Sequence, residues 1–196
     1  MQVIIVGHCN RSEWIERLHQ AIPGAAWVID FAGQGSTANH RRALELAATM
    51  NERCIIMEDD AIPVRGFVAQ AEVWLQRFPD DLISFYLGTG RPPKWQPRVD
   101  KALRETVTDH IYLNQLIHGV CYSVPAHRVQ WLLGRLSNHP EADFAIGLAW
   151  SAPVLYPVES LVDHRDGKPV EIHYDGQPRT ELRVARRLSG KLMYER

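Results

Sequence analysis

Short apolar runs alternate with helical repeats along the first half of the chain. Residues 2–7 form an apolar, β-branched run that ends at glycine, which predicts a buried strand. Trp14, Leu18 and Ile22 then repeat at helical spacing until Pro23-Gly24 stops the repeat. The pattern continues with strands over 25–30, 54–57 and 82–87, and with helices from Ser36 or Thr37 to about 51 and over about 67–78. Such alternation predicts a doubly wound α/β sheet.

The second half of the chain is less regular. Residues 88–97 hold glycines, three prolines and a tryptophan, which predicts a loop suited to be a lid or an acceptor loop. A strand over 120–124, a helix over 125–136 and a short helix over 143–150 are expected next. Asp-Gly pairs at 166–167 and 175–176 predict a hairpin, and residues 180–188 a basic helix. We expect one domain over 1–165, with the hairpin and basic helix of 166–196 packed on it.

Length and composition exclude several classes of protein. A chain of 196 residues suits one domain, and 45% apolar with 23% charged residues excludes disordered, collagen-like and coiled-coil chains. No stretch approaches the roughly 18 apolar residues of a membrane span, and the first residues do not resemble a signal peptide, so we expect a cytoplasmic protein. Cys9, Cys54 and Cys121 are widely spaced in apolar runs, which predicts reduced core residues.

Charge is unevenly distributed along the chain. The net charge of −1 combines +3 over 91–105 and +4 over 178–196 with about −8 over the remaining residues. Two basic segments on an acidic body favour an anionic substrate or partner, although such segments are also common on solvated surfaces.

Three consecutive carboxylates, Glu58, Asp59 and Asp60, follow the apolar strand 54–57. Their charges repel one another, so this arrangement is most stable beside a cation. Mg²⁺ and Mn²⁺ are commonly held by one or two carboxylates together with substrate phosphates. Ligands of open α/β sheets also bind beyond the carboxyl ends of the strands. The triplet therefore predicts a site for Mn²⁺ or Mg²⁺ and a phosphate-bearing ligand, with a solvated acidic turn as the alternative.

The order of motifs around the triplet resembles glycosyltransferases of the GT-A fold, particularly the family 25 type known from lipooligosaccharide synthesis. The matching pieces are the first strand with Arg11, the helix start at 35–40, the strand 54–57 and the triplet. Residues 118–124 resemble the strand before the family's second helix, and 156–158 with Asp163-His164 resemble its closing segment. The resemblance spans about residues 3–165 and implies a GT-A-like, Rossmann-like mixed sheet. Ser36 and His40 are further apart than the family's adjoining pair, and the basic tail has no counterpart in it.

The resemblance also implies roles for individual side chains. Asp60 would bind the metal together with Glu58 and the late histidine His164, and Glu58 or Asp59 would contact the ribose. Arg11 would bind a phosphate, because a guanidinium meets phosphate bidentately. Other contacts to the nucleotide are expected from His8 and Asn10 in the loop after the first strand, and from His40 and Arg42 at the start of the second helix. The alternative for each is a structural or solvated side chain.

The implied reaction needs a base as well as a donor site. Loss of a nucleoside diphosphate from an anomeric carbon passes through an oxocarbenium-like state, and inversion requires a carboxylate to accept the acceptor's proton. The resemblance places an acidic residue near the acceptor, which makes Asp143 the candidate base and Glu141 the second choice. Asp143 is also suited to be an ordinary helix N-cap. Trp95 in the acceptor loop could stack on a sugar or a base.

Together these features predict a metal-dependent glycosyltransferase that uses a nucleotide-sugar donor, expected to be a UDP-sugar. The acceptor hydroxyl is that of a glycan or of a hydroxymethylated DNA base; the basic segments would suit the DNA acceptor. The alternative function is a noncatalytic module that binds a nucleoside diphosphate and engages a partner through the basic tail.

Overall fold

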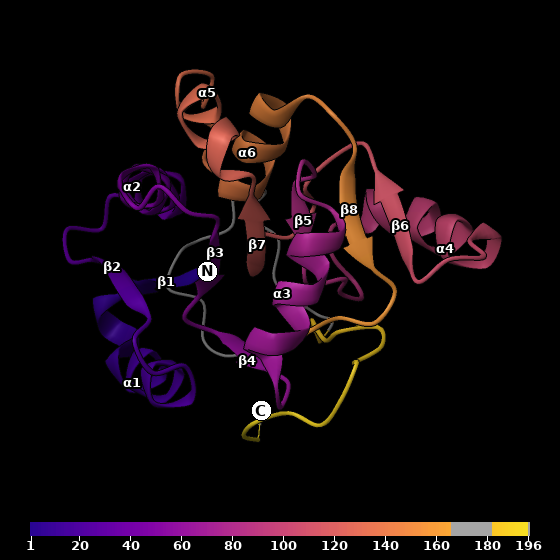
Figure 1. Cartoon of the computed structure of the whole chain (residues 1–196), viewed down its shortest axis with the longest axis horizontal. Coiled ribbons are helices and arrows are strands. Elements are labelled where there is room, and N and C mark those ends of the chain that lie inside the picture. Colours follow the sequence, from indigo (N-terminus) through magenta and orange to yellow (C-terminus); the bar gives the residue numbers. More distant parts are fainter. Residues whose placement is uncertain (166–181, 196) are drawn as a thin grey trace.

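A seven-stranded mixed sheet forms the centre of the protein in a computed structural model that describes residues 1–165 and 182–195 (Figure 1). The strand order is β2-β1-β3-β7-β5-β8-β6. β1 is parallel to β2 and β3, whereas β7 is antiparallel to β3 and β5. The strand bounds are β1 Gln2–His8, β2 Ala26–Asp30, β3 Cys54–Glu58, β5 Ile83–Ser84, β6 His110–Leu113, β7 Cys121–Val124 and β8 Val154–Pro157. The predicted α/β class with a mixed, Rossmann-like sheet is confirmed.

Helices cover both faces of this sheet. They are α1 Ser12–Ala21, α2 Ser36–Thr49, α3 Phe67–Arg77, α4 Gln96–Glu105, α5 Val129–Leu133 and α6 Ala142–Trp150, with short 3₁₀ turns η1 Cys9–Arg11, η2 Pro93–Trp95 and η3 Ala126–Arg128. Buried residues of α2, α5 and α6 pack on one face, and those of α1 and α3 on the other. Among the described helices, none has the length and apolar character needed to cross a membrane.

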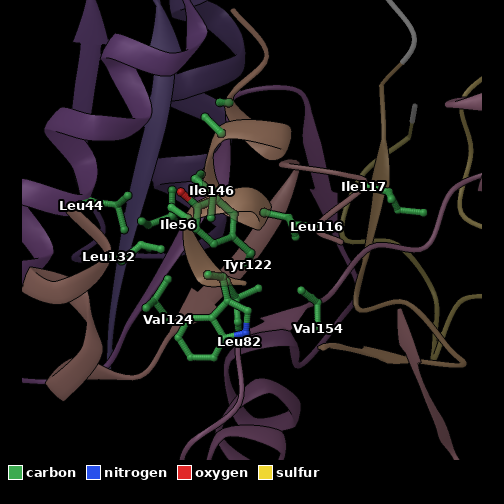
Figure 2. Packing of buried hydrophobic residues seen from close by; sticks show 14 of the residues in the cluster. Leu44, Ile56, Leu82, Leu116, Ile117, Tyr122, Val124, Leu132, Ile146 and Val154 are labelled. Atoms are coloured by element: carbon green, nitrogen blue, oxygen red, sulfur yellow. The ribbon is translucent and has the colours of Figure 1, made fainter. Parts of the chain in front are cut away.

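Side-chain alternation along β1 explains its continuous apolar sequence. Ile4 and Val6 belong to the core on the α2 side, part of which is drawn in Figure 2, and Val3 and Ile5 belong to the core on the α1 side. Successive side chains of a strand point to opposite faces, so a strand covered on both faces must be apolar throughout. Cys54 and Cys121 are also buried, whereas Cys9 is only half-buried, which corrects its prediction as a core residue.

The two strands that follow β1 in the sequence, β2 and β3, lie on opposite sides of β1 in the sheet. From β1 the chain passes through α1 to β2 on one side, and then through α2 to β3 on the other side. The carboxyl ends of β1 and β3 therefore diverge into separate connections, and open α/β sheets form ligand-binding crevices at such a switch point.

A small second sheet brings distant residues to this edge. It pairs β4, Ala61–Pro63, with β9, Val162–His164, in antiparallel register. Ala61 lies opposite His164, and the Arg165 amide donates to the carbonyl of Asp60 at 2.7 Å. The closing segment is thereby held directly beside the carboxylate triplet.

The basic tail is extended where the structure describes it. Residues 182–195 contain no helix, so the predicted basic helix is wrong over 182–188. Main-chain groups of this segment bond to distant residues rather than to one another: Val184 accepts from Thr89 and Arg186 donates to Leu87. The predicted hairpin at 166–176 lies outside the described residues.

Several boundaries also differ from the sequence expectations. The strand expected over 82–87 is short, and α4 begins inside the stretch expected to be a loop, because Pro93 and Pro97 occupy the first turns of η2 and α4. The helix expected over 125–136 is divided into η3 and α5 and ends earlier. The strands β4, β6 and β9 were not expected from the apolar pattern.

Candidate functional site

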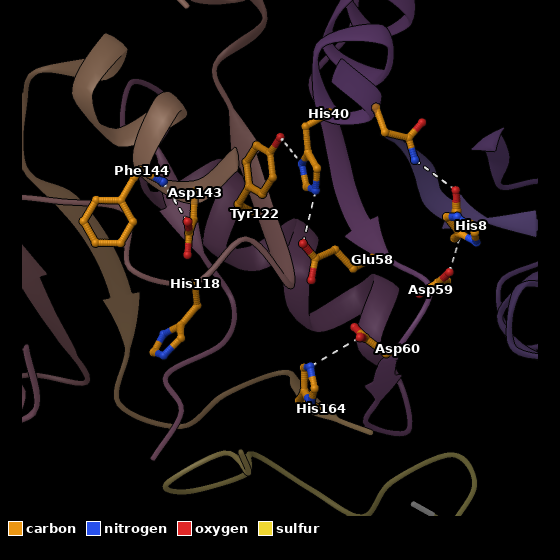
Figure 3. Close-up of polar contacts among 12 residues, drawn as sticks. His8, His40, Glu58, Asp59, Asp60, His118, Tyr122, Asp143, Phe144 and His164 are labelled. Atoms are coloured by element: carbon orange, nitrogen blue, oxygen red, sulfur yellow. Dashed lines mark hydrogen bonds and ion pairs between the residues drawn. The ribbon is translucent and has the colours of Figure 1, made fainter. Parts of the chain in front are cut away.

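A cavity of about 720 Å³ opens at the switch point, beyond the carboxyl ends of β1 and β3. This volume is within the usual range for small-molecule sites. Its walls combine the loop after β1, the start of α2, the carboxylate triplet, residues 117–120 before β7, the start of α6, and the C-terminal segment. Most of the residues predicted for the site therefore converge on one hollow (Figure 3).

Arg11 lies between two of the three carboxylates. Its Nη1 atom is 2.8 Å from Asp59 Oδ1 and 2.8 Å from Asp60 Oδ2, while its guanidinium stacks on Trp14. The second Asp59 oxygen accepts from the His8 amide at 2.9 Å. Both aspartates are buried, and burial together with the Asp60 charge raises the pKa of Asp59. The cation that the sequence required near the triplet is supplied, in part, by the chain itself.

His164 approaches Asp60 from β9. Its Nε2 atom is 3.4 Å from Asp60 Oδ2, and both side chains are almost fully buried. Burial opposes ionisation of Asp60, but His164, Arg11 and Arg183 outweigh it and hold the pKa of Asp60 below the ordinary carboxyl range. Asp60 is thus a buried carboxylate whose neighbours favour its ionised form.

Glu58 is oriented by a buried histidine. His40 Nε2 is 3.2 Å from Glu58 Oε1, and His40 Nδ1 is 3.1 Å from the Tyr122 hydroxyl, with the two rings stacked. His40 is 1% exposed and Glu58 extends into the cavity (Figure 3). A Cβ atom on Gly119 would lie 3.2 Å from Glu58 Oε1, so this glycine allows the carboxylate to lie against the main chain.

Asp143 lies across the cavity in the first turn of α6, beside Phe144 (Figure 3). Glu141, not Asp143, occupies the N-cap position, so the N-cap alternative for Asp143 is wrong. One Asp143 oxygen accepts from the Phe144 amide at 2.8 Å. Burial, with a further contribution from Glu58, raises the pKa of Asp143 to about 7. A carboxylate of this pKa is suited to exchange a proton near neutral pH.

Nine of the predicted site residues line this cavity, and two do not. The nine are His8, Arg11, His40, Glu58, Asp59, Asp60, Glu141, Asp143 and His164. Asn10 is exposed and does not line the cavity, and its main-chain amide donates to His8 Nδ1. Arg42 does not line the cavity. It pairs with Asp30 at the end of β2 and donates to Asn39 on its own helix, α2. Trp95 packs partly buried against the core beside Arg98, outside the lining of this cavity.

Sequence reasoning missed several residues of the lining. Asp30 ends β2 and accepts from the amides of Ala32 and Gly35. Its place at the carboxyl end of a predicted strand was a sequence signal for the site. Lys94 and Phe144 form a cation–π pair, with 4.7 Å between the ammonium and the ring centroid. Arg183 also lines the cavity, although the resemblance ended before it. Phe144 adjoins the predicted Asp143 and Lys94 lies in the predicted acceptor loop, so both had a signal in the sequence. Arg183 had none, because nothing in the local sequence links the tail to the triplet.

The described side chains supply only some of the ligands that a metal ion needs. Among the described residues, no three His, Cys, Asp or Glu side chains converge to make a complete metal site by themselves. Asp60 Oδ1 and His164 Nδ1 are nevertheless buried without a hydrogen-bond partner in the described part of the chain. A divalent ion that took most of its oxygen ligands from a diphosphate and water could use Asp60 Oδ1.

Comparisons with known proteins bear on the fold. No protein-family model matches the chain, and no curated protein matches its sequence. Among solved structures, A197 from STIV is similar, with a TM-score of 0.54 and 11% identity over 100% of this chain and 99% of that chain. A UDP-glucose pyrophosphorylase complexed with UDP-glucose reaches a TM-score of 0.46 and 12% identity over 80% and 72% of the two chains. The first likeness concerns the fold alone, and the second is too weak to add to it.

Proposed function

We propose that this protein is a metal-dependent glycosyltransferase that moves a sugar from a UDP-sugar to an acceptor hydroxyl. One observation carries the proposal: the cavity at the switch point has a charged corner, Asp59, Asp60, Arg11 and His164, and a carboxyl group of raised pKa, Asp143, across from it. The family 25 resemblance of residues 3–165 gives this arrangement its expected chemistry.

In this proposal the charged corner binds the diphosphate. Asp60 would hold Mn²⁺ or Mg²⁺ through its buried Oδ1 atom, with Glu58 or His164 completing the protein ligands. The ion, when bound, stabilises the negative charge that develops on the leaving phosphate. Arg11 lines the same corner and would add a guanidinium contact to phosphate.

Asp143 would act on the acceptor. In an inverting reaction its carboxylate accepts the acceptor's hydroxyl proton as the acceptor oxygen bonds to the anomeric carbon. The bond between that carbon and the phosphate oxygen breaks, and its electron pair leaves with the diphosphate. Glu141 lines the cavity nearby and is the second candidate for this step.

The acceptor is proposed to be a glycan, with a hydroxymethylated DNA base as the other candidate. The described tail gives DNA little support, because Arg186 is engaged by Asp100 and Gln96 and Arg183 lines the cavity. The same engagement weakens the alternative of a noncatalytic module that uses this tail to hold a partner. The exposed basic residues of α4 still leave a polyanion binding surface available.

The experiment is a titration of purified protein with UDP, GDP and dTDP, with and without Mn²⁺, followed by assays of sugar-nucleotide hydrolysis. We expect Mn²⁺-dependent UDP binding that stabilises the protein by about 2.7 kcal/mol at a hundredfold excess over Kd. Asp60→Asn should abolish the Mn²⁺ dependence, and the matched surface variant Asp80→Asn should not. Absence of nucleotide binding and of hydrolysis in the wild type would refute the proposal.

A further inference from the structure

The C-terminal segment 182–188 is fixed along the loop that follows β5. The Thr89 amide donates to the Val184 carbonyl at 2.9 Å, and the Arg186 amide donates to the Leu87 carbonyl at 3.0 Å. Gly88 and Ala185 form an antiparallel bridge between these bonds. The segment therefore acts as an added strand at the cavity rim, and its side chains have defined positions.

A buried aspartate ties the same segment to β9. Asp163 Oδ1 accepts from the Ala185 amide at 2.7 Å and from the His164 amide at 2.9 Å. Asp163 is 0% exposed, and the Ser160 amide donates to the Arg187 carbonyl at 2.9 Å. The Asp163 carboxylate thus fixes Ala185, two residues beyond Arg183, relative to His164. His164 in turn contacts Asp60.

The three arginines of the segment have different environments. Arg186 pairs with Asp100 and Gln96 on α4, and Arg187 is exposed. Arg183 is half-buried and lines the cavity in the company of Arg11, Asp60 and His164. Its charge is close enough to Asp60 and His118 to affect both groups.

The charge at this corner explains why the position of Arg183 matters. Arg11 lies against both aspartates, so one guanidinium serves two carboxyl groups. A diphosphate that entered the corner would bring further negative charge, which opposes binding unless another cation is near. Arg183 lines the same cavity and adds a second guanidinium there.

We propose that Arg183 binds the phosphate groups of the nucleotide, so that the segment beyond the family resemblance completes the donor site. The inference rests on the proposed function and adds a phosphate-binding residue to it. A guanidinium suits this role because two parallel N–H groups can meet two phosphate oxygens.

The test compares Arg183→Gln with the matched variant Arg187→Gln by calorimetric titration with UDP, uridine and inorganic pyrophosphate. We expect Arg183→Gln to weaken UDP and pyrophosphate binding by about tenfold or more, and to leave uridine binding unchanged. Arg187→Gln should match the wild type with all three. Measurements in EDTA and in Mn²⁺ separate the arginine's contribution from that of the ion.

The outcomes distinguish this inference from the proposed function. If the wild type binds UDP more tightly than uridine and Arg183→Gln keeps the same ratio, the Arg183 inference is wrong and the proposed function stands. If the wild type binds none of the three probes in either buffer, both are wrong. If Arg183→Gln does not fold, Arg183→Lys is measured instead, because lysine keeps the positive charge but cannot form two parallel hydrogen bonds to phosphate. A wild-type ratio of UDP to uridine affinity in Arg183→Lys would refute bidentate binding.

Discussion

Asp143 is a carboxyl group for which ionisation is costly in the folded protein, because burial raises its pKa to about 7. As a general base it must be deprotonated, so we expect the transfer rate to increase with pH and level off above about 7. Asp143→Asn should lower the rate by roughly 10²–10⁴-fold and remove this pH dependence. A pH–rate profile of both proteins with one acceptor makes the measurement.

Glu141→Gln is the control for that profile. Glu141 lies at the N-cap of α6, two residues before Asp143, and lines the same cavity, yet the variant should keep the rise with pH. If Glu141→Gln, and not Asp143→Asn, lowers the transfer rate and removes its pH dependence, the base is Glu141.

The same raised pKa predicts a change in stability that needs no substrate. The folded state holds the Asp143 proton up to about pH 7, whereas the unfolded chain releases it near 3.8. Asp143 therefore destabilises the fold increasingly from about pH 4 to pH 7, and by a constant amount above that. Asp143→Asn should raise the free energy of unfolding at pH 8 by roughly 2 kcal/mol, a value reduced for partial solvent access. Thermal melting at pH 4, 6 and 8 measures it, and an equal gain at all three values would contradict the account.

Gly119 gives a steric prediction at the same scale. In Gly119→Ala the new methyl group would lie 3.2 Å from Glu58 Oε1 and 3.7 Å from His40 Cε1, so the Glu58 carboxylate must move. We expect UDP binding to weaken several-fold with little change in melting temperature. Gly134→Ala is the matched control, since its methyl group meets its nearest atoms at 3.7 Å, an ordinary contact. Unchanged UDP affinity in Gly119→Ala would show that Glu58 does not need its present position.

Residue identity alone predicted the carboxylate part of the site well. Glu58, Asp59 and Asp60 are contiguous, so one strand end was enough to place them together. Asn10 was assigned to the site because it shares a loop with His8, and Arg42 because it lies with His40 at the start of a helix. A loop neighbour can face away from the cavity, and nothing in local sequence fixes that direction.

At the scale of the elements, Arg53 joins β3 to the end of α3. Its guanidinium donates to the carbonyls of Phe78, Pro79 and Asp81, and its Nε atom donates to Ser123 Oγ at 3.1 Å. These three carbonyls belong to the turn that follows α3, so Arg53 holds this turn against Ser123 of β7.

Arg53→Met should therefore lower the free energy of unfolding by about 2–4 kcal/mol. Arg17→Met is the control, because Arg17 forms an exposed pair with Glu13 and should change stability by less than about 0.5 kcal/mol. Urea denaturation of the two variants measures both values. Equal effects would mean that water replaces the Arg53 contacts.

The elements with strong periodicity could be predicted, and those made by long-range pairing could not. α1, α2 and α3 begin and end near their expected limits because each carries its own apolar repeat. β4 and β9 have three residues each and exist through their pairing with one another. The described tail is extended because carbonyls and amides at 87–89 and 160 are its partners, and a helix would leave those groups unpaired.

At the scale of the whole molecule, Asp163 connects the C-terminal segment to the body through its bond to the Ala185 amide. Asp163→Ala should release this segment and reduce UDP affinity, because Arg183 would lose its position. Asp163→Asn keeps one acceptor oxygen and is the milder control. Hydrogen exchange at Ala185 and Arg186 makes the measurement, and unchanged protection in Asp163→Ala would refute the connection.

The strand order could not be read from the sequence, although the class of the sheet could. Alternating elements indicate strands and helices, but they do not say that β7 pairs between β3 and β5. That insertion places Gly119 beside both Glu58 and Asp143: a Cβ atom on Gly119 would lie 3.2 Å from Glu58 Oε1 and 3.6 Å from Asp143 Cβ.

The cavity draws its walls from segments far apart in the chain, from Val6 to Arg183. Synthesis proceeds from the amino terminus, so the growing polypeptide exposes Asp59 and Asp60 on the ribosome well before residue 183 has been made. A nascent chain that has reached residue 165 holds the acidic corner with one of its two arginines missing. If Arg183 binds the phosphates as proposed, nucleotide capture would therefore wait for segment 182–188 to dock rather than follow directly from assembly of the sheet.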